Sequence, residues 1–166
     1  MSRISDENFD DILRAHAGLI GRIAASYEAD PSRRDDLCQE IAHALWQALP
    51  NFRGAAALRT FVARVAHNRC ASHALAERRR PRTQGLAEDL IDAASDPAHR
   101  ADLEQRRERL FAAVRRLPMG MRQAVSLALE GFSHGDIAAA LGIAVNSVDA
   151  QVSRARRRLA EWLGDS

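Results

Sequence analysis

Apolar residues recur at three- and four-residue steps along almost the whole chain, the spacing that places them on one face of an α-helix. Proline and glycine residues interrupt this pattern at points where helices end. The pattern predicts an all-α fold, with helices over about residues 6–29, 31–49, 55–80, 103–117, 119–130, 134–141 and 145–163.

The helical pattern lapses between residues 81 and 99. This segment, PRTQGLAEDLIDAASDPAH, contains proline, glycine, serine and four acids, which is typical of a linker. A chain of 166 residues is long enough for one ordinary core or two small ones, so length alone leaves the number of domains open. We therefore expect two small helical domains, residues 1–80 and 100–166, each with its own core and joined by a flexible linker.

The start of the chain, MSRISDENFDD, lacks the apolar core of a secretory signal, and no apolar run approaches the length of a membrane span. We expect a cytoplasmic protein without membrane insertion. Cys38 and Cys70 fall inside helical patterns, so we interpret them as small core residues rather than as a disulfide pair.

The spacing His67-x-x-Cys70-x-x-His73 raises the alternative of a zinc site. Six helical residues turn through about 600°, so the two histidines would point about 120° apart and could not easily chelate one ion. We predict no cofactor and no metal. All six histidines are scattered and no glycine-rich phosphate loop accompanies them, so an enzyme is the least expected class.

Basic charge is concentrated on the third predicted helix. The net charge of the chain is only +2, and all 24 basic residues are arginine. Between residues 55 and 82 there are seven arginines and one acid, Glu77. A solvated helix face is the alternative explanation, but the run RRRPR has few nearby acids with which to pair. We expect this helix to contact nucleic-acid phosphates.

The C-terminal part has the spacing of a helix-turn-helix. Ala138 would let two helices cross closely, Gly142 would form the tight turn, and Val148 would anchor the second helix. Ser133 begins a capping box for the first helix. A plain helical hairpin is the alternative, but the capped first helix and the glycine turn fit a DNA-binding module.

Three segments resemble the extracytoplasmic-function, or group IV, sigma factors of the sigma-70 family. DDLCQEIAHALWQALPNFRG (35–54) and LRTFVARVAHNRCASH (58–73) are similar to sigma region 2, and LPMGMRQAVSLALEGFSHGDIAAALGIAVNSVDAQVSRARRRL (117–159) is similar to region 4. The resemblance implies a sigma factor that binds core RNA polymerase and directs promoter-specific transcription initiation. It also implies that an anti-sigma factor controls the protein, which we expect to be monomeric with mobile domains when free.

The resemblance further implies where each partner binds. The coiled coil of the largest polymerase subunit would contact Asp36, Gln39, Glu40 and Trp46, and the polymerase flap would contact region 4. The minus-ten promoter element would contact Asn51, Phe52, Arg53, Arg59, Phe61, Arg64, Asn68 and Arg69. The minus-35 element would contact Asn146, Ser147, Asp149, Gln151, Ser153, Arg154 and Arg157.

The sequence departs from the family pattern at several of these positions. Phe61 and Ala63 stand where relatives often have tryptophan and another aromatic residue, so aromatic support beside the melted strand is reduced. Asp149 and Gln151 stand where relatives commonly have lysine and arginine, and Ala144 replaces a capping serine. A carboxylate accepts a hydrogen bond from cytosine but repels phosphate, so we expect a weaker or altered minus-35 preference. If the charge of Asp149 mainly repels phosphate, Asp149→Lys would strengthen binding to duplex DNA.

Two other classes of protein remain as alternatives at this point. A stand-alone transcription regulator would need a ligand pocket or a dimerisation face on residues 1–80, where the pattern predicts neither. A helical adaptor would have no direct DNA role, whereas a sigma factor would bind core polymerase and elute from heparin only at substantial salt.

Overall fold

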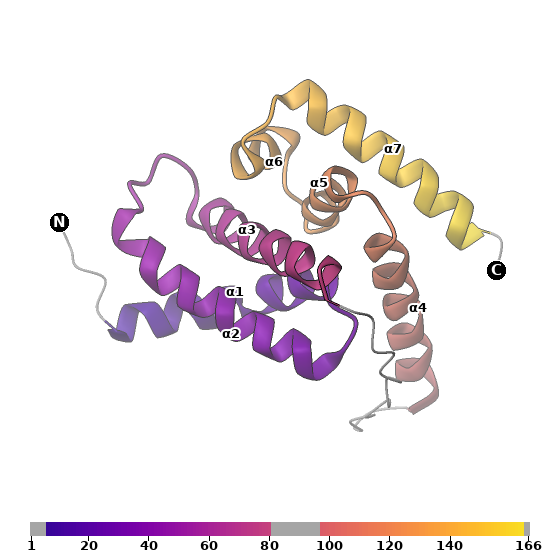
Figure 1. Ribbon diagram of the computed structural model, residues 1–166, viewed down its shortest axis with the longest axis horizontal. Helices are drawn as coiled ribbons and strands as arrows, with labels where there is room; N and C mark the ends of the chain where they lie inside the picture. The colour runs from indigo at the N-terminus through magenta and orange to yellow at the C-terminus, as the bar shows by residue number, and fades with distance from the viewer. Residues whose placement is uncertain (1–5, 81–96, 165–166) are drawn as a thin grey trace.

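The computed structural model describes residues 6–80 and 97–164, and every regular element in these ranges is helical (Figure 1). In chain order the elements are α1 (Asp6–Ala25), α2 (Pro31–Ala48), the 3-10 turn η1 (Leu49–Asn51), α3 (Leu58–Arg78), α4 (Pro97–Arg115), α5 (Met119–Leu129), α6 (His134–Leu141) and α7 (Val145–Gly164). The predicted all-α class is confirmed. Most of the predicted linker lies outside the described residues, and α4 begins at Pro97, inside the range expected for that linker.

The first three helices pack against one another and bury the apolar stripes expected from the sequence. Ile23 of α1, Ile41 of α2 and Val62 of α3 are all at most 1% exposed. The α2 helix begins as predicted, because the Asp30 side chain accepts a hydrogen bond from the backbone nitrogen of Arg33 and Pro31 occupies the first turn. None of the described helices is long and apolar enough to cross a membrane.

The α1 helix ends at Ala25, four residues earlier than predicted. The hydroxyl of Ser26 donates to the carbonyl oxygen of Ile23 at 2.6 Å, and the backbone nitrogen of Tyr27 donates to Ala24 at 3.0 Å. These bonds tighten the last turn. The Tyr27 side chain is thereby buried, with its hydroxyl 2.8 Å from Nδ1 of His67.

The helix-turn-helix has the predicted form. Ser133 accepts from the backbone nitrogen of Asp136 at 3.1 Å, which caps α6. Gly142 ends α6 with a φ of 66°, in the left-handed region that favours glycine. Val148 is fully buried and anchors α7 against the rest of the module.

The two halves of the described chain pack against each other, and one buried cluster extends across both, which the sequence analysis did not predict. Figure 1 shows α5 and α6 beside α3. One buried cluster joins residues of α1, α2 and α3 to Ala124 and Leu127 of α5 and Ile137 of α6. A second, smaller cluster contains residues of α4, α5 and α7, among them Val125, together with Leu117 from the turn between α4 and α5. Two small residues of α3, Ala63 and Ala66, are fully buried in the larger cluster, where small side chains allow close packing.

Candidate nucleic-acid interface

The segment before α3 contains an aromatic pair at the predicted minus-ten surface. The rings of Phe52 and Phe61 lie 5.0 Å apart between centroids with a tilt of 52°, and both side chains are half-buried. Asn51 and Arg53 are exposed beside them. Part of each ring therefore stays accessible for stacking, but the two rings also cover one another.

The arginines of α3 are engaged to different degrees. Arg64 and the neighbouring Asn68 are exposed, as predicted. Arg69 forms an ion pair with Glu40 of α2, with Nε 3.0 Å and the second guanidinium nitrogen 2.9 Å from the carboxylate. Arg59 donates to the carbonyl oxygen of Glu130 at 2.7 Å. Arg59 and Arg69 thus each have a polar partner within the protein, while 45% and 47% of their side chains stay exposed.

Arg59 also connects the two halves of the chain through an aromatic ring. Its guanidinium carbon lies 4.1 Å from the centroid of Phe132, which is 7% exposed. A guanidinium over a ring face at this distance is attracted by the ring quadrupole. One predicted DNA contact is thus held by the segment between α5 and α6.

The predicted polymerase face on α2 is exposed. Asp36, Gln39 and Glu40 line a shallow groove together with His43 and Gln47. Trp46 is 54% exposed at the same helix. The Glu40–Arg69 pair links this face to α3, so the acidic and basic predicted surfaces meet along one edge.

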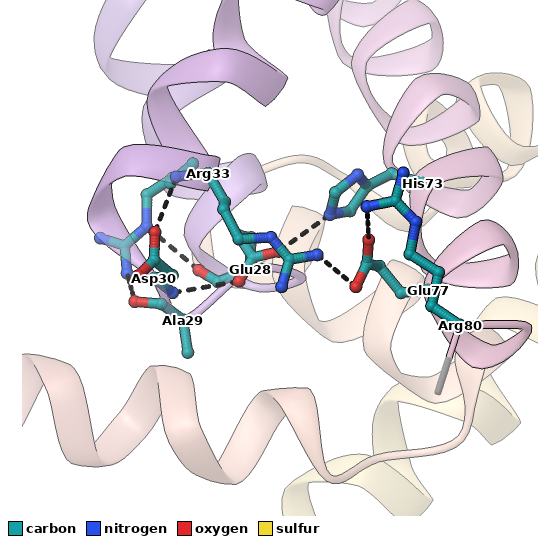
Figure 2. A network of polar contacts seen from close by, with 8 residues as sticks. Glu28, Ala29, Asp30, Arg33, His73, Glu77 and Arg80 are labelled. Atoms are coloured by element: carbon teal, nitrogen blue, oxygen red, sulfur yellow. Dashed lines mark hydrogen bonds and ion pairs between the residues drawn. The ribbon is translucent and has the colours of Figure 1, made fainter. Parts of the chain in front are cut away.

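A polar network ties the start of α2 to the end of α3 (Figure 2). The Glu28 carboxylate lies 2.9 Å from Nε2 of His73, and Arg33 pairs with both Glu28 and Glu77. The hydrogen bond to Glu77 raises the pKa of Arg33, and the same bond lowers the pKa of Glu77. Glu77 therefore forms ion pairs with two arginines, Arg33 of α2 and Arg80, the second at 3.6 Å.

His67 and His73, the two histidines of the possible zinc spacing, have different partners. Tyr27 bonds to His67, and Glu28 pairs with His73. His67 is fully buried, and burial lowers its pKa to about 3. Among the described residues, no group of three or more potential ligands is arranged to hold a metal.

The outer face of α7 carries the predicted minus-35 residues. Six of them are exposed: Asn146, Ser147, Asp149, Ser153, Arg154 and Arg157. Gln151 is half-buried. Its amide nitrogen lies so near Gly120 of α5 that a methyl group added to this glycine would be only 3.0 Å from it. It therefore packs against α5 rather than pointing fully outward. Asp149 pairs through Oδ1 with Nδ1 of His134, the first residue of α6, a contact that the sequence analysis missed.

Further polar contacts, none of them expected from the sequence, join the two halves. Glu130 binds Arg22 of α1 in a bidentate manner, at 2.6 and 2.9 Å, and this hydrogen bonding raises the pKa of Arg22. Arg115 donates to the carbonyl oxygen of Ala25 at 2.8 Å. Arg122 lies 5.3 Å from the ring centroid of Tyr27, and burial lowers its pKa.

Two family models match the chain. Sigma-70 region 2 matches residues 12–80, and sigma-70 region 4 matches residues 107–159. The chain belongs to the sigma-70 family. Its similarity to the ECF RNA polymerase sigma-E factor of Escherichia coli K12 is 30% identity over 155 residues, covering 86% of this chain and 78% of that protein. It is also 30% identical to the RNA polymerase sigma-H factor of Pseudomonas aeruginosa over 161 residues, which cover 91% of this chain and 83% of that protein.

Solved structures show the same fold. CnrH in complex with the cytosolic domain of CnrY has a TM-score of 0.71 at 24% identity, covering 98% of this sigma factor and 91% of that chain. The sigma factor RpoE of Bartonella quintana, in complex with the anti-sigma factor NepR, has a TM-score of 0.73 at 23% identity. The match covers 95% of this sigma factor and 98% of that chain. The chain is thus an extracytoplasmic-function sigma factor, a transcription initiation factor that directs RNA polymerase to promoters.

Proposed function

We propose that this sigma factor docks on core polymerase through the exposed face of α2 and reads promoter DNA with two separate surfaces. The segment from Asn51 through α3 contacts the minus-ten element, and the outer face of α7 contacts the minus-35 element. The observation that carries the proposal is that the α2 face and the α7 face are both exposed on the same packed chain. Two partners can therefore be engaged at once.

The minus-ten surface has the two properties that capture of single-stranded DNA requires. Arg53 and Arg64 are exposed cations that would guide the phosphate backbone, and Phe52 and Phe61 offer partly accessible ring faces on which bases stack. The aromatic surface is small because the rings cover one another. We therefore expect the backbone contacts to contribute most of the affinity here.

The minus-35 surface follows the usual division of labour in a helix-turn-helix. Residues near the start of α7, such as Asn146 and Ser147, would reach base edges in the major groove. Arg154 and Arg157 lie further along the helix and would contact phosphates, which fixes the register without reading sequence.

An anti-sigma factor would act on the packed arrangement of the two halves. In this arrangement Arg59 donates to the carbonyl oxygen of Glu130 and lies over the Phe132 ring, and these contacts would compete with binding to the minus-ten strand. A protein that binds both halves together would keep it there. The similarity to RpoE, whose solved structure contains the anti-sigma factor NepR, supports this assignment. The sigma factor would work in the cytoplasm, where polymerase and promoter meet, and would carry out no chemistry of its own.

Transcription in vitro with core polymerase on a promoter library randomised at both elements tests the proposal. Trp46→Ala should weaken binding to core polymerase, whereas Leu75→Ala, which alters an equally exposed apolar residue on α3, should not. Arg64→Ala should reduce promoter opening with core binding unchanged. The proposal would be refuted if Trp46→Ala and Leu75→Ala had equal core affinities, or if Arg64→Ala had full activity on every promoter.

A further inference from the structure

The recognition helix presents a carboxylate that is held from the other helix of the helix-turn-helix. Asp149 lies in the second turn of α7, with its side chain 54% exposed. His134 is the first residue of α6, and its side chain is 41% exposed. Nδ1 of His134 bonds Oδ1 of Asp149. An ionised carboxylate can only accept hydrogen bonds, so Nδ1 is the donor.

This pair does little for folding, because both side chains are exposed and solvent weakens their attraction. It has a larger effect on the position of the carboxylate. The pair joins residues 15 positions apart, so it fixes Asp149 relative to α6 as well as to its own helix. The contact uses Oδ1, which leaves Oδ2 as a second acceptor oxygen of the carboxylate.

We propose that His134 positions Asp149 to accept a hydrogen bond from the exocyclic amine of one cytosine in the minus-35 duplex. The inference rests on the proposed function, in which α7 enters the major groove. Cytosine offers N4 as a donor in that groove, and a carboxylate is a suitable acceptor. Adenine also has an exocyclic amine there, but its N7 acceptor lies next to it and would repel the carboxylate. The pair therefore selects cytosine.

The pairing changes the expectation drawn from the sequence alone. An unpaired acid on this helix would mainly repel phosphate, and its removal would strengthen binding to any duplex. If His134 orients the acid so that it reads one base, the acid instead strengthens binding to sequences that carry this base. Removal of Asp149 then costs affinity for the preferred sequence and leaves other sequences little changed.

The test is selection of promoters by the full-length chain bound to core polymerase, from a library randomised only in the minus-35 element. The wild-type chain should select cytosine at one position by about tenfold over thymine, which corresponds to the lower part of the range for a base contact. Asp149→Ala should abolish this preference. Asp149→Asn should shift it towards adenine, because an amide pairs with N6 and N7 of that base.

His134 is a positioning residue, and its variants separate that role from a purely structural one. His134→Ala should reduce the cytosine preference severalfold at the same position and leave the preferences at other positions unchanged. His134→Gln, which keeps a side-chain donor, should restore part of it. Loss of stability alone would lower activity on all promoters equally and would not change one base preference. Glu161→Gln removes the same charge from an exposed site further along α7 and should change no preference.

The possible outcomes distinguish the inference from the proposed function. If the library shows minus-35 preferences that do not respond to Asp149 or His134, the inference is wrong and the proposed function stands. If Asp149→Asn strengthens binding to all sequences alike, the acid only repels phosphate and the inference is again wrong. If the wild-type complex shows no minus-35 preference at all, the proposed role of α7 itself fails.

Discussion

The bidentate contact between Arg22 and Glu130 should hold the two halves of this sigma factor together. The two bonds are 2.6 and 2.9 Å long, and the Glu130 side chain is only 12% exposed, whereas Arg22 is 41% exposed. A hydrogen bond to a charged group contributes about 1.5–3 kcal/mol, and an exposed ion pair about 0–1 kcal/mol. Because one partner is half exposed, we expect a coupling of about 1–2 kcal/mol between them.

This coupling predicts how far Glu130→Ala opens the packed arrangement. About 1–2 kcal/mol corresponds to a change of roughly fivefold to thirtyfold in the ratio of open to closed molecules. Arg22→Ala should have a similar effect, and the double variant should open little further than either single variant. Glu104→Ala removes an acid that pairs with Arg107 within α4, so it should leave the ratio unchanged.

Energy transfer between two dyes measures this ratio. Cysteines introduced at Gln47 of α2 and at Glu161 of α7, both exposed, would carry the dyes in a background in which Cys38 and Cys70 are alanine. The open fraction follows from the populations of low and high transfer efficiency. The reasoning would be refuted if the effects of the two single variants added fully, because the residues would then be uncoupled.

Two further predictions concern stability. Burial lowers the pKa of His67 to about 3, so the unfolded chain takes up the proton first as the pH falls, and the free energy of unfolding should drop by up to about 1.4 kcal/mol per pH unit from about pH 6.5 down to about pH 3. Urea titrations should show this slope in the wild type and a smaller one in His67→Gln; equal slopes would contradict it. Gly142→Ala should cost about 1–2 kcal/mol because of its φ of 66°. Gly135→Ala lies inside α6, where the added methyl group would meet only the Ser133 hydroxyl, at an ordinary contact distance of 3.8 Å. It should be neutral or stabilising in thermal unfolding, and equal melting temperatures for both variants would contradict this.

The helices themselves could be predicted because their signals are local. Asp30 and Pro31 start α2, Ser133 caps α6, and Gly142 ends it, each within four residues of the group that it contacts. The end of α1 was missed because no breaker marks it. There the hydroxyl of Ser26 bonds a helix carbonyl, and a serine at such a position is equally compatible with a continuing helix.

The exposure of the candidate site was largely predictable, but its partners were not. Helical spacing places Asn146 and Arg154 on the outer face of α7, opposite the buried Val148, and the structure agrees. The partners of Asp149 and Arg59 lie 15 and 71 positions away in sequence. Helical periodicity relates residues within one helix and contains no information on which side chain from another helix will meet them.

The shared core was missed because α5 is buried on more than one side. Ala124 and Leu127 belong to the cluster shared with α3, whereas Val125 belongs to the smaller cluster with α4 and α7. A single apolar stripe was assumed for each helix, and small residues such as Ala124 do not mark a second one clearly.

The packed arrangement separates docking on polymerase from engagement of promoter DNA. Trp46 is exposed on α2, whereas Arg59 is held by Glu130 and Phe132. A packed molecule can therefore present its proposed polymerase face before Arg59 is released, whereas the contacts of Arg59 with Glu130 and Phe132 would compete with its binding to phosphate. Glu130→Ala should consequently leave the affinity for core polymerase unchanged and increase promoter opening at limiting sigma factor. Equal gains in both measurements would show that α2 is also restrained by the packing, and the two steps would then not be separable.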